Sequence, residues 1–386
     1  MKKKTQFILI LILFPILLFG QKDRTLNKDT LSNWTQAVMK EYEIPGMVIS
    51  VFSGDSLYNI AAEGVRRIGT NDLITKYDKF HIGSCGKAIT GFIAGRLVEK
   101  DLISWDTKVL EIFPELENIS RPEYKNIDFN DVLSNHSGVR PFTEDEEWEK
   151  LIEFDNVDNK QKRYDFTKWL LQQQAVEIDS VKKHSYSNAG FSIAAAMMEK
   201  VAGTTWEELV ENEFAIPLQI QPIIGWPGYN HDNQPWGHWI EEGDSILTEH
   251  SPYHEYKLDN IITPAGNYSL SIGDYTKFLQ LNLKGLNGKD TILKSSTYNF
   301  LHYCNFDPNI ELFGFYSIGW AAFKVPPEKS MTISTHAGSA GTFYCLTVLY
   351  KEPDFGMTII ANAGTDLASD GVKKIKNKIE KHFGLR

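Results

Sequence analysis

The segment Ser84-Cys85-Gly86-Lys87 opens the stretch of sequence that decides the fold of this chain. The residues before it, 76–83, are typical of a loop and turn. Those after it carry apolar residues spaced for one face of a helix, at Ile89, Phe92, Ile93 and Leu97. The sequence therefore predicts a long, buried helix over residues 84–100. A serine in its first turn and a lysine three residues later share a face.

This pairing suggests an activated serine, because an amine held beside a hydroxyl in a dry cleft can lose its proton and act as a base. The alternative is a helix-capping serine followed by a solvated lysine. Ser-x-x-Lys recurs at 180–183, in a charged stretch that we interpret as surface. Cys85 would point about 100° away from Ser84 around the helix, so we do not expect it to be the nucleophile.

The N-terminus has the pattern of a secretory signal peptide. Three lysines, at positions 2–4, precede thirteen mostly apolar residues from Phe7 to Phe19. Thirteen helical residues are too short for a hydrocarbon core of about 30 Å. We therefore predict a signal peptide over residues 1–20 and an exported protein, periplasmic or secreted. The alternative is an uncleaved N-terminal anchor, because Leu18 fits poorly two positions before Gly20.

Charge and cysteine content exclude several classes of protein. Without residues 1–20, the chain has 37 basic and 50 acidic residues, a net charge near −13. This balance disfavours nucleic acid and anionic membrane surfaces as partners, so we expect no membrane contact beyond the signal segment. Three scattered cysteines, Cys85, Cys304 and Cys345, are too few for a disulfide framework.

Helices and strands are distributed unevenly along the chain. We expect a helix over 31–42 capped by Asp29 or Thr30, and a hairpin of strands 47–52 and 57–62. Helical patterns dominate the middle, at 84–100, 127–134, 145–154, 165–175, 190–202 and 205–213, and long loops are expected over 225–260. The end of the chain predicts strands at 331–335, 342–350 and 357–361, and a final helix over 367–382.

This order predicts an α+β fold. One antiparallel sheet would be built from both chain ends and flanked by the terminal helices, with a mainly helical part inserted. The sheet domain would comprise residues 25–75 and 255–386, and the helical domain with the cleft loops residues 76–254.

Two further motifs could complete a serine site. Tyr186-Ser187-Asn188 directly precedes an apolar helix, so its side chains could project into a cleft. A phenol near a lysine ammonium can have its pKa lowered and can then shuttle a proton. The alternative is a capping loop with a half-buried tyrosine. The second motif, His336-Ala337-Gly338-Ser339, lies between strands, and its small residues would let the backbone approach a ligand closely. The alternative is an ordinary glycine-rich turn between edge strands.

Together, the ordered motifs resemble the serine β-lactamase and penicillin-recognising enzyme superfamily, and most closely its class C-like branch. Tyr-x-Asn follows Ser-x-x-Lys by 102 residues, and His-x-Gly follows 150 residues later. Four further stretches support the likeness: 80–84 before the nucleophile, 131–139 ("LLxHTSG"), 264–269 ("PAGGLxS") and 314–320 ("YGxGW"). The resemblance covers roughly residues 30–382 and implies a helical domain beside an antiparallel sheet.

The resemblance also implies roles for individual residues. Ser84 would be the nucleophile, Lys87 its proton acceptor or tuning partner, and Tyr186 the general acid/base. Asn188 would contact the substrate or the lysine, with His336 and Gly338 as further substrate-binding positions. The backbone N–H groups of Ser84 and Ser339 would form the oxyanion hole. No metal and no cofactor are implied.

One departure from the family pattern bears on the substrate. Many β-lactamases carry Lys-Thr-Gly where this chain has His336-Ala337-Gly338. Histidine is only partly charged near neutral pH and would be a weaker partner for a substrate carboxylate. We therefore rank peptidase or esterase activity on a small-molecule or peptide substrate above penicillin hydrolysis. Loops near 140–160 and 225–260, with Trp226, Trp236 and Trp239, are expected to shape the acyl pocket or to pack against the body.

Two other functions stay open at the level of the sequence. The chain could be a penicillin-binding or sensing protein that keeps its acyl adduct. It could also be a metallohydrolase whose ligands are four loop histidines and a glutamate: His231, His238, Glu249, His250 and His254. Pro252 argues against a regular helix that would present His250 and His254 as a pair of ligands. The sequence does not indicate the oligomeric state.

Overall fold

The computed structural model describes residues 26–143, 145–154, 158–178, 184–229, 233–306, 315–324 and 331–385. The predicted signal segment 1–20, the second Ser-x-x-Lys at 180–183 and His231 lie outside these residues. Within them, no helix is both long and apolar enough to cross a membrane.

A seven-stranded antiparallel sheet is formed from both ends of the chain, as predicted. The hairpin of the N-terminal part pairs with the last strand, in the register Met47↔Ala361. Ser339 pairs with Tyr344 further along the sheet. In spatial order the strands are β2 (Leu57–Gly64), β1 (Gly46–Phe52), β12 (Phe355–Ala361), β11 (Tyr344–Tyr350), β10 (Thr332–Ser339), β9 (Ala321–Lys324) and β8 (Phe315–Tyr316).

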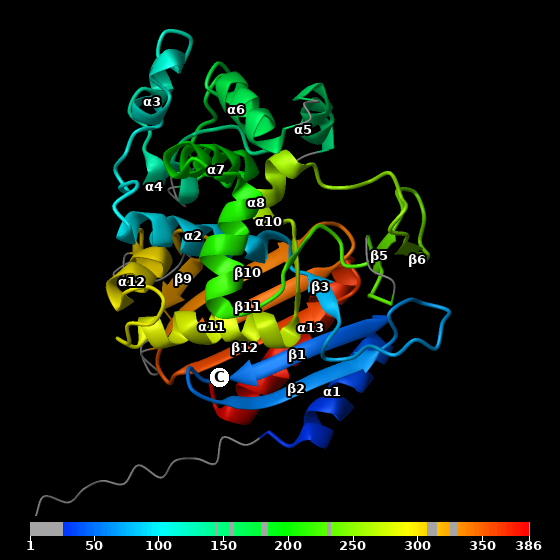
Figure 1. Ribbon diagram of the computed structural model, residues 1–386. Coiled ribbons are helices and arrows are strands. Elements are labelled where there is room, and N and C mark those ends of the chain that lie inside the picture. Colours follow the sequence, from blue (N-terminus) through cyan, green and yellow to red (C-terminus); the bar gives the residue numbers. More distant parts are fainter. Residues whose placement is uncertain are drawn as a thin grey trace, which may run out of the picture.

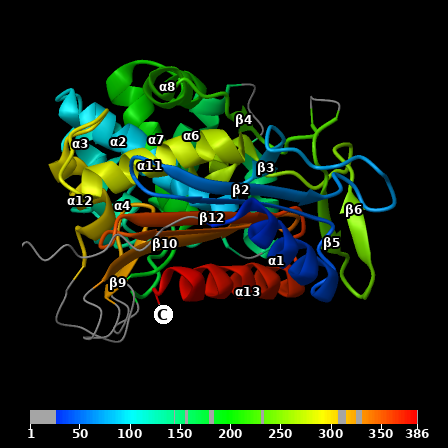
Figure 2. The same cartoon turned by 90° about the horizontal axis from the view of Figure 1, so that it is seen from below.

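The two terminal helices cover one face of this sheet, as Figure 2 shows. They are α1 (Lys28–Glu41) and α13 (Asp366–Phe383). The cap of α1 is Asn27, whose side chain accepts from the N–H of Asp29, so the predicted cap at Asp29 or Thr30 was wrong. α13 is amphipathic and begins at the capping Thr365. A separate apolar cluster between helices and sheet fixes this face.

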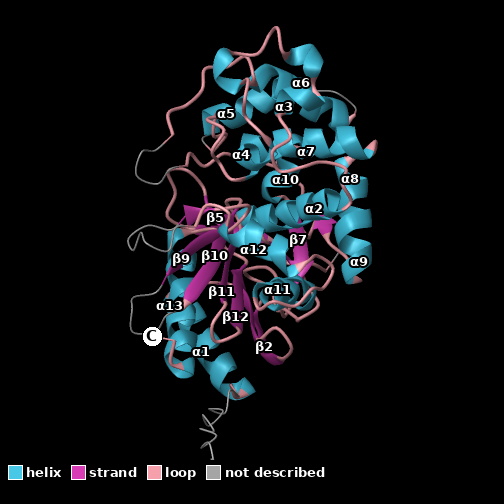
Figure 3. Ribbon diagram, turned by 90° about the vertical axis from the view of Figure 1, so that its left-hand side faces the viewer, coloured by secondary structure: helices cyan, strands magenta, loops and turns pink. Residues whose placement is uncertain are grey.

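A larger helical body lies on the other face (Figures 1 and 3). α2 (Lys87–Glu99) is its central helix and is buried nearly all round, which explains its almost uniformly apolar sequence. The other helices are α3 (Val109–Ile112), α4 (Phe129–Leu133), α5 (Asp145–Glu149), α6 (Asn159–Leu170), α7 (Asn188–Ala202), α8 (Trp206–Leu209), α9 (Ile216–Leu218), α10 (Thr263–Gly266), α11 (Ile272–Leu286) and α12 (Ser295–Tyr303).

Short strands connect the helical body to the large sheet. β3 (Lys79–His81) pairs with β7 (Tyr268–Ser271), which also pairs with β4 (Ile223–Ile224). The stretch predicted as long loops instead contains a hairpin, β5 (Gly237–Ile240) and β6 (Leu247–His250). β3 leads directly to Ser84, so this small sheet fixes where the predicted nucleophile emerges.

Candidate active site

Ser84 lies in a single turn of 3-10 helix, Gly83–Gly86, that leads into α2. The α-helix therefore begins at Lys87, three residues later than predicted. Residues three apart are eclipsed in a 3-10 turn, so the two side chains stand together. Lys87 Nζ lies 3.3 Å from Ser84 Oγ. The lysine is fully buried and the serine half-buried, so a substrate can reach the hydroxyl.

The Lys87 amine is held by two oxygen acceptors. Its Nζ donates to Asn188 Oδ1 at 2.5 Å and to the carbonyl of Ala265 at 2.7 Å. Asn188 is itself fixed, because its Nδ2 donates to the carbonyl of Phe142. Burial lowers the pKa of Lys87 well below its ordinary value, which favours the neutral amine. A neutral amine has two N–H groups and one lone pair, so two acceptors leave the lone pair for Ser84.

Tyr186 brings its ring beside the amine, just before α7. The Lys87 Nζ lies 4.7 Å from the ring centroid. Burial raises the pKa of the Tyr186 phenol, and the interaction with the Ser84 side chain only partly offsets this. The expected lowering of this pKa by a lysine ammonium was therefore wrong. Burial also disfavours the ammonium form of Lys87, the cation that could stabilise a phenolate, so the raised pKa keeps the proton on Tyr186.

His336 is neutral, which corrects the expectation of partial charge. Its pKa is lowered to about 3, mainly by burial. Nδ1 lies 2.6 Å from the carbonyl of Ala337, so Nδ1 carries the proton. Nε2 then accepts from the Tyr316 hydroxyl at 3.1 Å. Tyr316 packs edge-on against Tyr186, which places His336 and both phenols on one side of the site.

Glycines let two backbone segments, β10 and the turn at Gly83, meet at Ser84. A Cβ on Gly338 of β10 would lie 2.1 Å from the carbonyl oxygen of Ile82 and 2.7 Å from the amide nitrogen of Ser84. A Cβ on Gly83 would lie 2.4 Å from the amide nitrogen of Ser339. The structure thus brings the backbone of Ser339 against the turn that carries Ser84. The Ser339 side chain is exposed and caps the N–H of Gly341.

The cysteine beside the predicted nucleophile points away from it, as predicted. Cys85 is buried, and its Sγ donates to the carbonyl of His336 behind the turn. Burial raises the pKa of this thiol well above its ordinary value. Cys85 therefore packs the turn against the sheet and offers no thiolate to a substrate.

Two residues near the predicted nucleophile had no role in the sequence-based prediction. His81 is buried with a pKa lowered to about 4 by burial, and its Nδ1 accepts from the N–H of Gly83. Its Nε2 therefore donates to Asn267 Oδ1 at 3.1 Å. Both residues lie in stretches that carry the family resemblance, at 80–84 and 264–269. Their pairing could not be read from the sequence, because 186 residues separate them.

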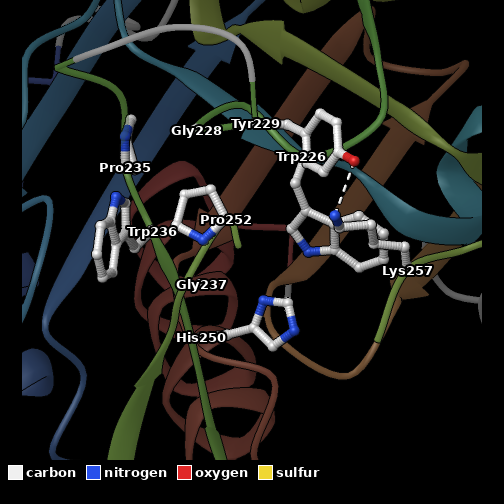
Figure 4. A pocket seen from close by; sticks show the side chains of 9 residues that line it. All are labelled: Trp226, Gly228, Tyr229, Pro235, Trp236, Gly237, His250, Pro252 and Lys257. Atoms are coloured by element: carbon white, nitrogen blue, oxygen red, sulfur yellow. Dashed lines mark hydrogen bonds between the residues drawn. The ribbon is translucent and has the colours of Figure 1, made fainter. Parts of the chain in front are cut away.

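A cleft of about 580 Å³ starts at Asn267 and extends between the helical body and the 225–260 stretch. Trp226 forms part of its wall and stacks on His81, with ring centroids 4.9 Å apart. Residues from both predicted loops line the cleft. Trp236 instead packs this stretch onto the body, where Arg67 lies over its ring, and Trp239 packs within the stretch by stacking on Tyr256. Figure 4 shows Trp226 and Trp236 around a smaller cavity next to this cleft.

The described histidines of the metallohydrolase alternative make hydrogen bonds or ring contacts within the protein. His238 accepts from the N–H of Ile68 through Nε2 and donates to the carbonyl of Asn362 through Nδ1. His250 and His254 lie ring to ring beside Trp239. Among the residues that the structure describes, no three His, Cys, Asp or Glu side chains are arranged to hold a metal ion.

Comparisons with known proteins agree with this architecture. Penicillin-binding protein 4 of Amycolatopsis lactamdurans is 24% identical over 192 residues, which are 50% of this chain and 47% of that protein. Teichoic acid D-alanine hydrolase of Staphylococcus aureus is 23% identical over 164 residues, 42% of this chain and 36% of that protein. This chain thus spans less than half the length of these two relatives.

A solved structure shares the fold over most of both chains. The class C beta lactamase from Rhodobacter sphaeroides superposes with a TM-score of 0.69 at 17% identity, over 92% of this chain and 99% of that one. The family model described as Beta-lactamase matches residues 31–377. Since that match runs from the first helix into the last, this chain belongs to the beta-lactamase family.

Proposed function

We propose that this protein is a serine hydrolase that forms an acyl-enzyme on Ser84 and cleaves an amide or an ester. The observation that carries the proposal is the environment of Lys87. Its two N–H groups are taken by Asn188 and Ala265, and its remaining position faces Ser84 Oγ. A buried neutral amine in that position is a general base for a hydroxyl.

In the first half of the reaction, Ser84 Oγ attacks the substrate carbonyl carbon and its proton passes to Lys87 Nζ. The backbone N–H groups of Ser84 and Ser339 are the proposed donors to the developing oxyanion. The bond to the leaving group then breaks as the Tyr186 hydroxyl protonates it, and Lys87 returns a proton to Tyr186. A protonated phenol suits this task, because burial keeps the proton on Tyr186 until a leaving group takes it.

Water completes the second half of the reaction. It attacks the acyl carbon, loses its proton to the same Lys87–Tyr186 pair, and releases the acid with Ser84 restored. His336 supports the pair without carrying charge, since it fixes Tyr316 against Tyr186.

The charge state of His336 favours some substrates over others. A neutral histidine offers no fixed positive charge to a substrate carboxylate. We therefore place ester or D-amino-acid peptide hydrolysis ahead of β-lactam hydrolysis. The name of the relative teichoic acid D-alanine hydrolase supports this ranking. The lysines at positions 2–4 and the apolar run Phe7–Phe19 support an exported enzyme.

A substrate panel tests the proposal. β-Lactams, D-amino-acid peptides and short-chain esters are assayed with the wild type and with Ser84→Ala. We expect turnover of at least one ester or peptide and its loss in the variant. Equal turnover by both proteins would refute the proposed nucleophile.

The second candidate is a penicillin-binding or sensing protein, which the name of the relative penicillin-binding protein 4 favours. The lifetime of a β-lactam adduct on Ser84 separates the two. Mass spectrometry should find the adduct transient for a hydrolase, and a permanent adduct without turnover of any panel member would support the sensor.

A further inference from the structure

The cleft that begins at Asn267 lies directly beside the proposed nucleophile. Asn267 follows Gly266, on which a Cβ would lie 2.9 Å from Ser84 Cα. The Asn267 side chain also binds His81, which accepts from the N–H of Gly83. The Asn267 end of the cleft therefore adjoins the backbone turn that carries Ser84.

Aromatic rings form much of the cleft wall. Trp226 and Tyr256 pack edge to face near Asn267, with ring centroids 5.8 Å apart. Trp148 and Tyr229 contribute from the helical side and from the mouth. Aromatic faces are negative, so a wall of this kind attracts cations as well as apolar groups.

The charged residues of the cleft favour a cation too. The described residues that line it include one amine, that of Lys257, and three carboxylates, those of Glu149, Glu255 and Asp259. Glu149 and Glu255 are exposed, whereas Asp259 also caps a short helix and lies 3.9 Å from Lys162. Since Asp259 has Lys162 beside it, the exposed carboxylates of Glu149 and Glu255 are the charges that favour a cation here.

One cation, the amine of Lys257, already lies against an aromatic ring of this wall. Its Nζ lies 4.0 Å from the ring centroid of Tyr229 and donates to the Tyr229 hydroxyl at 2.7 Å (Figure 4). Trp226 and Tyr256 line the same cleft near Asn267, with Trp226 stacked on His81 and Tyr256 on Trp239. On the other side of Ser84, His336 is neutral and offers no competing positive charge.

We propose that this cleft binds a cationic group of the substrate, of the alkylammonium class, on its aromatic wall beside Ser84. The inference rests on the proposed hydrolase function and narrows its substrates to esters or amides that carry a positive charge. Hydrolysis itself is unchanged: the substrate and one water give the acid and the alcohol, the thiol of a thioester, or the amine.

Two pairs of matched substrates test the inference, since the cation could belong to the acyl group or to the leaving group. The first pair is the p-nitrophenyl ester of trimethylammoniobutanoate and its carbon isostere, in which tert-butyl replaces trimethylammonium. The second pair is acetylthiocholine and its tert-butyl isostere. We expect kcat/KM to be about fivefold or more higher for the cationic member of at least one pair, and the ratio to fall at high salt.

Variants of the carboxylates supply the control. Glu149→Gln with Glu255→Gln should bring the ratio of cationic to neutral kcat/KM close to one. The matched double variant Glu117→Gln with Glu211→Gln alters two exposed residues outside the cleft lining and should keep the wild-type ratio. A general effect of net charge would lower the ratio equally in both double variants and would overturn the inference.

The outcomes separate the inference from the function on which it rests. Ser84-dependent hydrolysis with no cationic preference in either pair overturns the inference alone. Labelling of Ser84 by a fluorophosphonate without turnover of any of the four substrates overturns it as well. Failure of both labelling and turnover contradicts the proposed hydrolase itself.

Discussion

The protonation of Lys87 is the residue-scale property on which the chemistry depends. Taking a lysine out of water disfavours its ammonium form, and no carboxylate of the described residues forms a hydrogen bond or an ion pair with its Nζ. Its two acceptors, an amide and a backbone carbonyl, suit a neutral amine. The site therefore prepares its base by burial.

Replacing Lys87 with methionine tests this property. The side chain keeps its length and its burial but has no lone pair for the Ser84 proton. We expect the rate of fluorophosphonate labelling to fall by at least about 10²-fold. In the wild type the labelling rate should rise with pH as the Lys87 ammonium loses its proton. The pKa of this step should lie well below the ordinary lysine value of 10.5. An unchanged pH profile in Lys87→Met, with the protein folded by circular dichroism, would contradict this role.

Tyr186→Phe isolates the phenol oxygen. The ring contacts with Lys87 and Tyr316 can be kept, and only the proposed proton donor is lost. We expect kcat for an amide or alkyl ester to fall by about 10²- to 10⁴-fold. Esters with a good leaving group, such as p-nitrophenol, need little protonation and should lose much less. Equal losses for both substrate types would argue against the acid role.

The sequence predicted which residues meet but not their charge. Spacing alone indicated that Ser84 and Lys87 share a face, and order along the chain indicated Tyr186 and His336. The protonation states depend on burial by segments more than a hundred residues away, which no local pattern reports. For this reason the expected pKa of Tyr186 and the expected charge of His336 were both wrong.

At the scale of elements, β10 and the η1 turn, Gly83–Gly86, must touch for the site to exist. Gly338→Ala would drive a methyl group into the carbonyl of Ile82 at 2.1 Å. We expect a loss of stability of about 2 kcal/mol or more and a strong loss of Ser84 labelling, because the strand must move away from the turn.

Gly273→Ala is the matched control for that substitution. Gly273 lies in the first turn of α11 with nothing within 4 Å of the methyl group that alanine would add, and alanine favours a helix. The melting temperature of Gly273→Ala should equal or exceed that of the wild type, and Ser84 should be labelled as fully as in the wild type. A similar loss in both variants would show that the close approach at Gly338 is not the cause.

Element boundaries show where local patterns were insufficient. The hairpin of β1 and β2 and the helix α13 were predicted closely, because their periodicity is long and regular. β3, β4 and β7 were not predicted, since strands of two to four residues carry almost no periodic signal. α6 begins at Asn159 behind its cap Asp158, six residues before the predicted start.

At the scale of the whole molecule, the antiparallel sheet from both chain ends followed from the order of strands and helices. The division into a sheet domain and a helical domain stays a prediction. What the sequence could not provide is the way in which the 3-10 turn and α2, which belong to the larger apolar cluster, fit against the large sheet. That fit depends on close contacts at Gly83, Gly266 and Gly338, which act across 180 or more residues.

Buried neutral histidines predict how stability depends on pH. The pKa values of His81 and His250 are lowered to about 4 and that of His336 to about 3, mainly by burial. An unfolded histidine titrates near 6.5. The unfolded state therefore binds more protons between pH 6.5 and 4, and stability falls as pH falls through this window.

Thermal melts measure that dependence. We expect the melting temperature to drop from pH 7 to pH 4.5, with each histidine contributing on the order of 2–3 kcal/mol across the window. His81→Asn removes one of these groups, so its drop should be smaller than that of the wild type. Parallel curves for the two proteins would contradict the assignment of a neutral, buried His81.

The most direct test of the central claim is peptide mapping by mass spectrometry after reaction with a fluorophosphonate. We predict one covalent adduct, on Ser84, which forms in the wild type, is slowed in Lys87→Met and is absent in Ser84→Ala. An adduct on another residue, or one that forms at the same rate in Lys87→Met, would contradict a lysine-activated serine at this position.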